Sequence, residues 1–84
     1  VGVLALVDKD KVTRARLNSI DRGPNLVLFD AQGRSRMMLS VRAGQAAVGI
    51  QDSSGDVRAG LEVRNDNPAF ALYGPNGKPL FVKP

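Results

Sequence analysis

One pattern of side chains recurs at a spacing of 22 positions, and it constrains the fold more than any other feature. Its members are Leu26, Asp30, Gly33, Arg36 and Leu39, which recur as Val48, Asp52, Gly55, Arg58 and Leu61. An earlier copy holds Leu4, Asp8, Arg14 and Leu17, and a later, divergent copy holds Phe70, Leu72 and Gly77. Self-similarity at such a period is typical of repeat proteins. We therefore expect one domain over residues 1–84, built from copies at about 2–22, 23–44, 45–66 and 67–84.

Each copy reads as a β-hairpin. Leu26 and Leu28 alternate with Val27 and Phe29, which is the periodicity of a strand. An Asp-x-x-Gly turn follows: the aspartate can accept a bond from a backbone N–H, and the glycine can adopt the left-handed conformation that forms a one-residue bulge. The predicted turn-forming residues are Asp8, Asp30, Gly33, Asp52, Gly55 and Gly77. Lys11 replaces the glycine in the first copy, so that turn must differ in type or strain Lys11.

The returning strand of each hairpin also alternates. Met37, Leu39 and Val41 fall on one face and Arg36, Met38 and Ser40 on the other, and the next copy repeats the apolar set as Val57, Ala59, Leu61 and Val63. The sequence thus predicts one apolar face for burial. The expected core or interface residues are Leu4, Leu6, Leu17, Leu26, Leu28, Leu39, Val41, Val48, Ile50, Leu61, Val63, Phe70 and Leu72.

Short links between the hairpins predict an all-β meander of about eight antiparallel strands. The last strand contains Pro79 and is followed by Lys83 and Pro84, which makes it a poor partner for closing a barrel with the first strand. An open meander would leave its apolar face bare, so we expect another copy of the chain to cover it. A start within a strand also suggests a fragment of a longer array.

The composition argues against an enzyme. The chain has no cysteine and no histidine, which excludes disulfides, thiolate metal sites and the usual catalytic triads. We expect no cofactor and no metal. Small domains without disulfides or structural metal ions gain stability by associating or by stacking repeats. The longest apolar run, residues 1–7, is too short to span a membrane and lacks the features of a signal peptide.

The net charge is +4, but the basic excess lies in the first half of the chain and the third copy is acidic. This distribution is not that of a nucleic-acid-binding stripe, and Phe70 occupies a leucine position of the repeat rather than a stacking position. The sequence therefore does not predict nucleic acid as a partner. The sequence leaves the compartment open.

Two columns of charged residues have alternative interpretations. The aspartates at positions 8, 30 and 52 could bind Ca²⁺, but turn formation explains them more simply. Arg14, Arg36 and Arg58 could bind phosphate or a sulfated glycan, since guanidinium groups match planar oxyanions. Salt bridges to the aspartates are the favoured alternative for the arginines.

The repeat L-x-L-x-D-x-x-G-x-x-R-x-x-L-x-V resembles hairpin repeats of uncharacterised bacterial and phage-type proteins, where the array often follows a coiled coil. The match runs from Leu4 to Val82; Lys11, Gly74 and Lys83 depart from it. The resemblance implies a fibre-like module packed as a trimeric β-prism. Asp30 to Arg34 is also similar to tyrosine-aspartate repeats of bacterial toxin shells, although no copy has a tyrosine directly before the aspartate.

These observations predict a non-catalytic structural module that forms homo-oligomers, with a trimer favoured. A module that binds an anionic polymer through the three arginines is the main alternative. A monomeric β-barrel around a small ligand is the second alternative.

Overall fold

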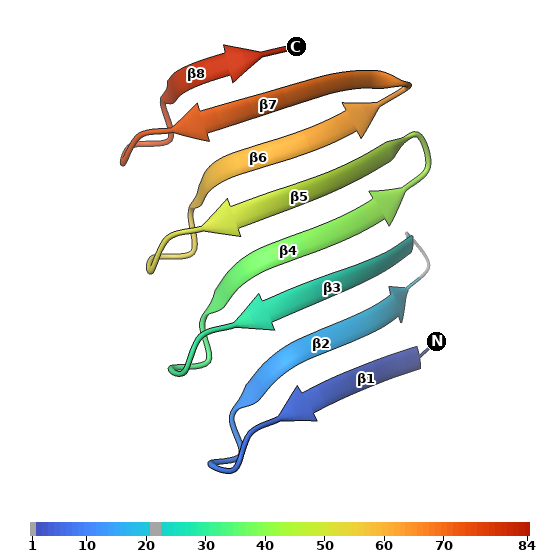
Figure 1. Cartoon of the computed structure of the whole chain (residues 1–84), viewed down its shortest axis with the longest axis vertical. Helices are drawn as coiled ribbons and strands as arrows, with labels where there is room; N and C mark the ends of the chain where they lie inside the picture. The colour runs from blue at the N-terminus through green and yellow to red at the C-terminus, as the bar shows by residue number, and fades with distance from the viewer. Residues whose placement is uncertain (1, 21–22) are drawn as a thin grey trace.

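The chain folds into one antiparallel β-sheet with eight strands in sequence order (Figure 1). The computed structural model describes residues 2–20 and 23–84. Its strands are β1 (Gly2–Val7), β2 (Thr13–Ile20), β3 (Gly23–Phe29), β4 (Ser35–Arg42), β5 (Gln45–Gln51), β6 (Val57–Arg64), β7 (Asn67–Tyr73) and β8 (Pro79–Lys83). There is no helix within these ranges. The predicted all-β meander is confirmed.

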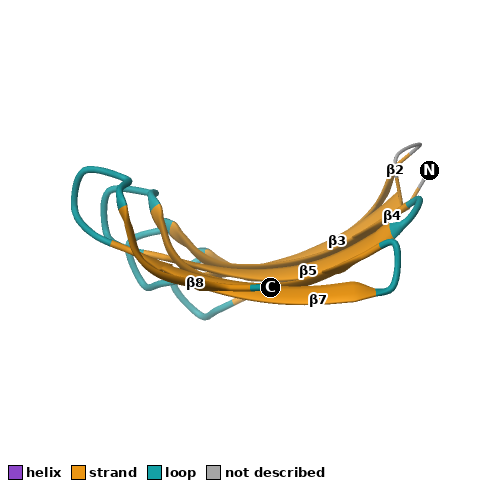
Figure 2. Ribbon diagram, turned by 90° about the horizontal axis from the view of Figure 1, so that it is seen from above, coloured by secondary structure: helices purple, strands orange, loops and turns teal. Residues whose placement is uncertain are grey.

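The sheet is open and one layer thick. β1 and β8 lie at opposite edges rather than side by side, and the molecule measures 41 × 30 × 14 Å. Seen from above, the strands curve together into a shallow trough (Figure 2). No second layer covers either face within the described ranges, so the chain by itself does not form a closed barrel.

All four hairpins turn in the same way. In the second hairpin, Asp30 N–H donates to the Arg34 carbonyl at 2.9 Å and Gly33 N–H donates to the Asp30 carbonyl at 3.0 Å. Gly33 has a φ of +80°, in the left-handed region. Such a turn, with a left-handed residue in its third loop position, joins strands that keep their right-handed twist.

The first hairpin forms this turn without glycine. Lys11 N–H donates to the Asp8 carbonyl at 3.0 Å, and Lys11 takes up the left-handed conformation itself, with a φ of +65°. The sequence left open whether the turn would change or the lysine would be strained, and the structure has the strained lysine. A side chain in this conformation costs about 1–2 kcal/mol.

A β-bulge follows each turn. In the second hairpin Leu28 pairs with Met37 but Phe29 pairs with Ser35, so Arg36 is the extra, unpaired residue. Arg14, Arg58 and Leu80 occupy the same position in the other hairpins. The expected alternation is therefore wrong at the start of each returning strand. Val57 pairs with Gln51 and lies on the face opposite Leu61, because the bulge shifts it by one residue.

Burial within the single chain is slight. Among the described residues Val27 is the one buried large apolar side chain, with 7% of its surface exposed. Val27 pairs with Arg16 and Met38, so it lies on the face that carries the polar side chains. The apolar face has no equivalent buried side chain among the described residues. The sheet thus has two different surfaces, one apolar and one mixed.

Candidate functional site: the arginine column and the apolar face

The arginine column, defined as Arg14, Arg36 and Arg58, connects neighbouring hairpins. Arg36 Nε donates to the backbone carbonyl of Gln51 at 2.9 Å, and Gln51 belongs to the next hairpin. The Nη1 of Arg36 lies 3.5 Å from Asp30 Oδ2 in its own hairpin. One side chain therefore bridges a turn and the strand of the following copy.

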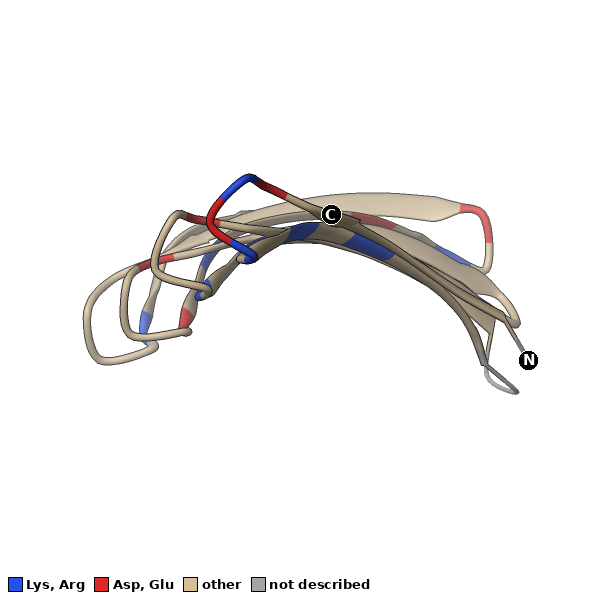
Figure 3. Ribbon diagram, turned by 90° about the horizontal axis from the view of Figure 1, so that it is seen from below, with Lys and Arg blue, Asp and Glu red and all other residues tan. Residues whose placement is uncertain are grey.

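The other two arginines repeat this arrangement. Arg14 Nε donates to Phe29 O at 3.3 Å, and Arg58 Nε donates to Tyr73 O at 2.7 Å. Their Nη1 atoms each lie 3.4 Å from an aspartate of their own hairpin, Asp8 for Arg14 and Asp52 for Arg58. In each case the acceptor carbonyl lies 15 residues after the arginine. Figure 3 shows acidic and basic positions close together in the hairpin turns at the left of the view.

The aspartate column, defined as Asp8, Asp30 and Asp52, organises the turns. Asp30 Oδ1 accepts the backbone N–H groups of Gln32 and Arg34, both at 3.0 Å. Asp8 and Asp52 accept the N–H groups two and four residues later in the same way. These carboxylates lie where the sequence predicted turn-forming residues, and each one also faces an arginine.

The pKa of each column aspartate is lowered from its ordinary value. For Asp8 the Val12 N–H is the largest cause, and for Asp52 it is the Ser54 N–H; each bond favours the charged carboxylate. Around Asp30 partial burial acts to raise the pKa. The N–H and guanidinium of Arg34, together with the Gln32 N–H, outweigh it. All three aspartates are therefore set to remain ionised at neutral pH.

The three arginines are already engaged by protein acceptors. A guanidinium that donates to a carboxylate and a carbonyl has fewer N–H groups for a ligand, and the neighbouring aspartate repels an anion. The geometry therefore supports a structural role more directly than the binding of a polyanion. Exposed ion pairs of this kind contribute little individually, so the bonds to the backbone carbonyls matter more.

The apolar face holds every residue that the sequence assigned to a core or interface. One row of cross-strand partners crosses the sheet from Leu4 to Phe70, and a parallel row runs from Leu6 to Phe81. The first row is Leu4, Leu17, Leu26, Leu39, Val48, Leu61 and Phe70; the second is Leu6, Ala15, Leu28, Met37, Ile50, Ala59, Leu72 and Phe81. Val41 and Val63 flank them, each paired with Ala46.

These side chains are mostly exposed in the single chain. Leu4 and Leu6 are each 61% exposed, and Leu39 is 36% exposed. Phe70 and Phe81 contact each other with ring centroids 5.3 Å apart, but no second layer covers the pair among the described residues. Exposed apolar surfaces of this extent are uncommon on small monomeric proteins and are typical of interaction sites.

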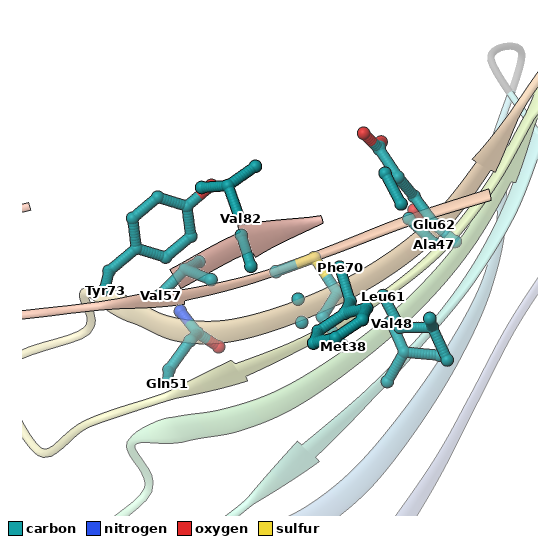
Figure 4. A pocket seen from close by; sticks show the side chains of 15 residues that line it. Met38, Ala47, Val48, Gln51, Val57, Leu61, Glu62, Phe70, Tyr73 and Val82 are labelled. Atoms are coloured by element: carbon teal, nitrogen blue, oxygen red, sulfur yellow. The ribbon is translucent and has the colours of Figure 1, made fainter. Parts of the chain in front are cut away.

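The opposite, mixed face forms a groove of about 340 Å³ lined by residues of β4–β8. Figure 4 shows Tyr73, Val82 and Glu62 on the inner side of the curved sheet. Gly49 and Gly60 pair with each other in the floor of the groove, where the absence of side chains leaves it open. The sequence reasoning did not single out this groove, although the small residues of β5–β7 could have signalled it.

Within residues 2–20 and 23–84 no cluster of His, Cys, Asp or Glu side chains is suited to hold a metal ion. The same ranges contain no helix long and apolar enough to cross a membrane. Comparisons with models of known protein families and with curated protein sequences found no match.

Proposed function

We propose that this chain is a non-catalytic structural module that self-associates through its apolar face. The observation that supports this most directly is a single-layer sheet with one apolar face of leucine, valine, isoleucine and phenylalanine side chains. A sheet must bury such a face against another layer to be stable. The four hairpins supply the face, and the chain supplies no second layer in its described part.

The accessible surface supports the same proposal. The molecule exposes 6134 Å², whereas a compact monomer of 8.9 kDa would expose roughly 4,800 Å². The excess is on the order of 1,300 Å², which falls within the size range of specific protein–protein interfaces. A second copy of the chain carries a complementary surface of the same size and composition.

We favour a trimer, in which three sheets enclose a shared core as a β-prism. The support for three copies is the resemblance of the repeat to fibre-like hairpin arrays. Two sheets packed face to face, about 10 Å apart, would also cover the leucine rows. A homo-oligomer of either kind would have no need of a metal or cofactor.

The first experiment is the solution mass by light scattering on a sizing column across a range of concentrations. A mass near three times 8.9 kDa supports the trimer. A mass near twice 8.9 kDa would instead indicate a dimer with two sheets packed face to face. A clean monomer that unfolds cooperatively would overturn the proposal.

A matched pair of variants locates the interface. Leu39 and Met38 are neighbours on β4, are both 36% exposed and lie on opposite faces of the sheet. Leu39→Asp is expected to dissociate the oligomer because it places a charge in the apolar seam, whereas Met38→Asp is expected to leave the mass unchanged. Equal effects of the two variants would remove the apolar face as the interface.

A further inference from the structure

The two edges of the sheet differ in how they are protected. β8 carries Pro79 and Lys83, and both residues are typical of strands that block further pairing. β1, with the sequence GVLALV, has neither a proline nor a charge, and all six of its residues are exposed. An unprotected apolar edge is a template for one more strand.

The arginine column shows which backbone groups of β1 point away from β2 and have no strand partner among the described residues. Phe29, Gln51 and Tyr73 each accept an arginine Nε from the preceding hairpin, so their carbonyls point toward the preceding strand. Val7 is the residue at the same repeat position in the first hairpin. Its carbonyl accordingly points away from β2, and because alternate residues of a strand point the same way, so do the N–H and C=O groups of Val3 and Ala5.

We infer that the β1 edge is a binding site for an antiparallel β-strand of the form R-x-x-L-x-V. β4 shows the register, because it pairs in this way with β5, the counterpart of β1 in the third hairpin. Leu39 pairs with Val48 and Met37 with Ile50, while Arg36 reaches the carbonyl of Gln51. On β1 the docked leucine would lie opposite Leu4, and the docked arginine would donate to Val7 O.

Both the side chains and the backbone groups of the β1 edge support such a partner. Leu4 and Leu6 are among the most exposed leucines in the sheet. They begin the two rows of apolar side chains, and the docked strand would continue each row by one residue beyond them. The docked strand would also form hydrogen bonds with the backbone N–H and C=O groups of Val3, Ala5 and Val7, which point away from β2. β8 cannot supply this strand from another copy of the chain, because Leu80 stands in the arginine position and Pro79 lacks an N–H.

This inference concerns an edge rather than the apolar face, and it stands whether or not the chain forms a trimer. The test uses a synthetic peptide with the sequence of β4, Ser35–Arg42, added to the full chain. Amide hydrogen exchange followed by NMR is expected to show slower exchange at Val3, Ala5 and Val7 as the peptide saturates. A peptide with Arg36→Ala is expected to bind about tenfold more weakly, since a charge-assisted hydrogen bond is lost.

Ala5→Pro is the matched control in the protein. The N–H of Ala5 points away from β2, so proline removes a docking group without removing a bond between β1 and β2. The variant should keep the circular dichroism spectrum of the parent chain and lose peptide binding. Three results would each overturn the inference: unchanged exchange at β1, binding that survives in folded Ala5→Pro, or equal affinity of the Arg36→Ala peptide.

Discussion

Leu80 lies against Gly74 in the fourth hairpin, at the two positions where the other hairpins pair an arginine with an aspartate. A Cβ added to Gly74 would be 3.4 Å from Leu80 Cδ2, and Gly74 is buried. The turn keeps its backbone bonds, with Gly74 N–H donating to Lys78 O at 2.9 Å. An apolar contact thus replaces the ion pair, because both positions carry a different residue from the one in the other hairpins.

The two positions should therefore be energetically coupled. Gly74→Asp alone places a carboxylate against Leu80, and Leu80→Arg alone places a guanidinium beside a glycine, so each change should destabilise the chain. The double variant restores the pairing of the other hairpins and should recover about 0.5–1 kcal/mol relative to the sum of the single effects. Urea unfolding of all four proteins measures this coupling; additive effects would contradict it.

The bond from Arg36 to the next hairpin should contribute to stability. Arg36→Met keeps much of the side-chain length but removes the bonds to Gln51 O and Asp30, with an expected loss of about 1 kcal/mol. Arg42→Met is the control, because Arg42 is exposed on the same strand and makes no side-chain hydrogen bond to any described residue. Urea midpoints that fall equally for both variants would count against a bridging role.

The strained turn of the first hairpin predicts a stabilising substitution. Lys11→Gly should raise the free energy of unfolding by about 0.5–1 kcal/mol, because glycine adopts a φ of +65° without a steric cost and loses part of that gain in chain entropy. Gly33→Lys makes the reverse exchange at a φ of +80° and should destabilise the chain. Thermal unfolding of the two variants should shift in opposite directions.

The lowered pKa values of Asp8, Asp30 and Asp52 predict weaker folding in acid. A carboxyl whose folded pKa lies below its unfolded value, near 3.8, stabilises the native state at higher pH. That contribution is lost as the pH falls through 3.8 toward the lower folded values. Denaturation at pH 6 and pH 3 should show a smaller pH dependence when all three are changed to asparagine, which keeps an oxygen acceptor for the turn but does not titrate.

A role of the arginine column in binding anionic polymers can be separated from general charge. We expect Arg14→Gln, Arg36→Gln and Arg58→Gln together to change heparin retention no more than three control substitutions. Those controls remove the exposed cations Lys9, Arg42 and Lys83, and so match the change in charge. A clearly larger loss of retention for the column variant would favour the polyanion-binding function instead.

The hairpins could be predicted because their causes are local. Alternating β-formers and the Asp-x-x-Gly turns act within a few residues, so the sequence indicated the meander and the apolar face. The one-residue bulge at the left-handed turn glycine was expected, and Gly33 has that conformation. The second bulge, at Arg36, was missed, because one extra residue there leaves the downstream alternation of Leu39 and Val41 intact. It shifts only the residues between the turn and the bulge, which is why the face of Val57 was predicted wrongly.

The sequence by itself determined the repeat, the turns and the two faces, since these depend on spacing and on local backbone preferences. The tertiary structure decided the partner of each arginine. The carbonyls of Phe29, Gln51 and Tyr73 lie 15 residues away, and no sequence pattern marks a backbone acceptor. Their positions follow from how one hairpin registers against the next. The same register leaves β1 as an open edge and turns the apolar residues into one exposed surface.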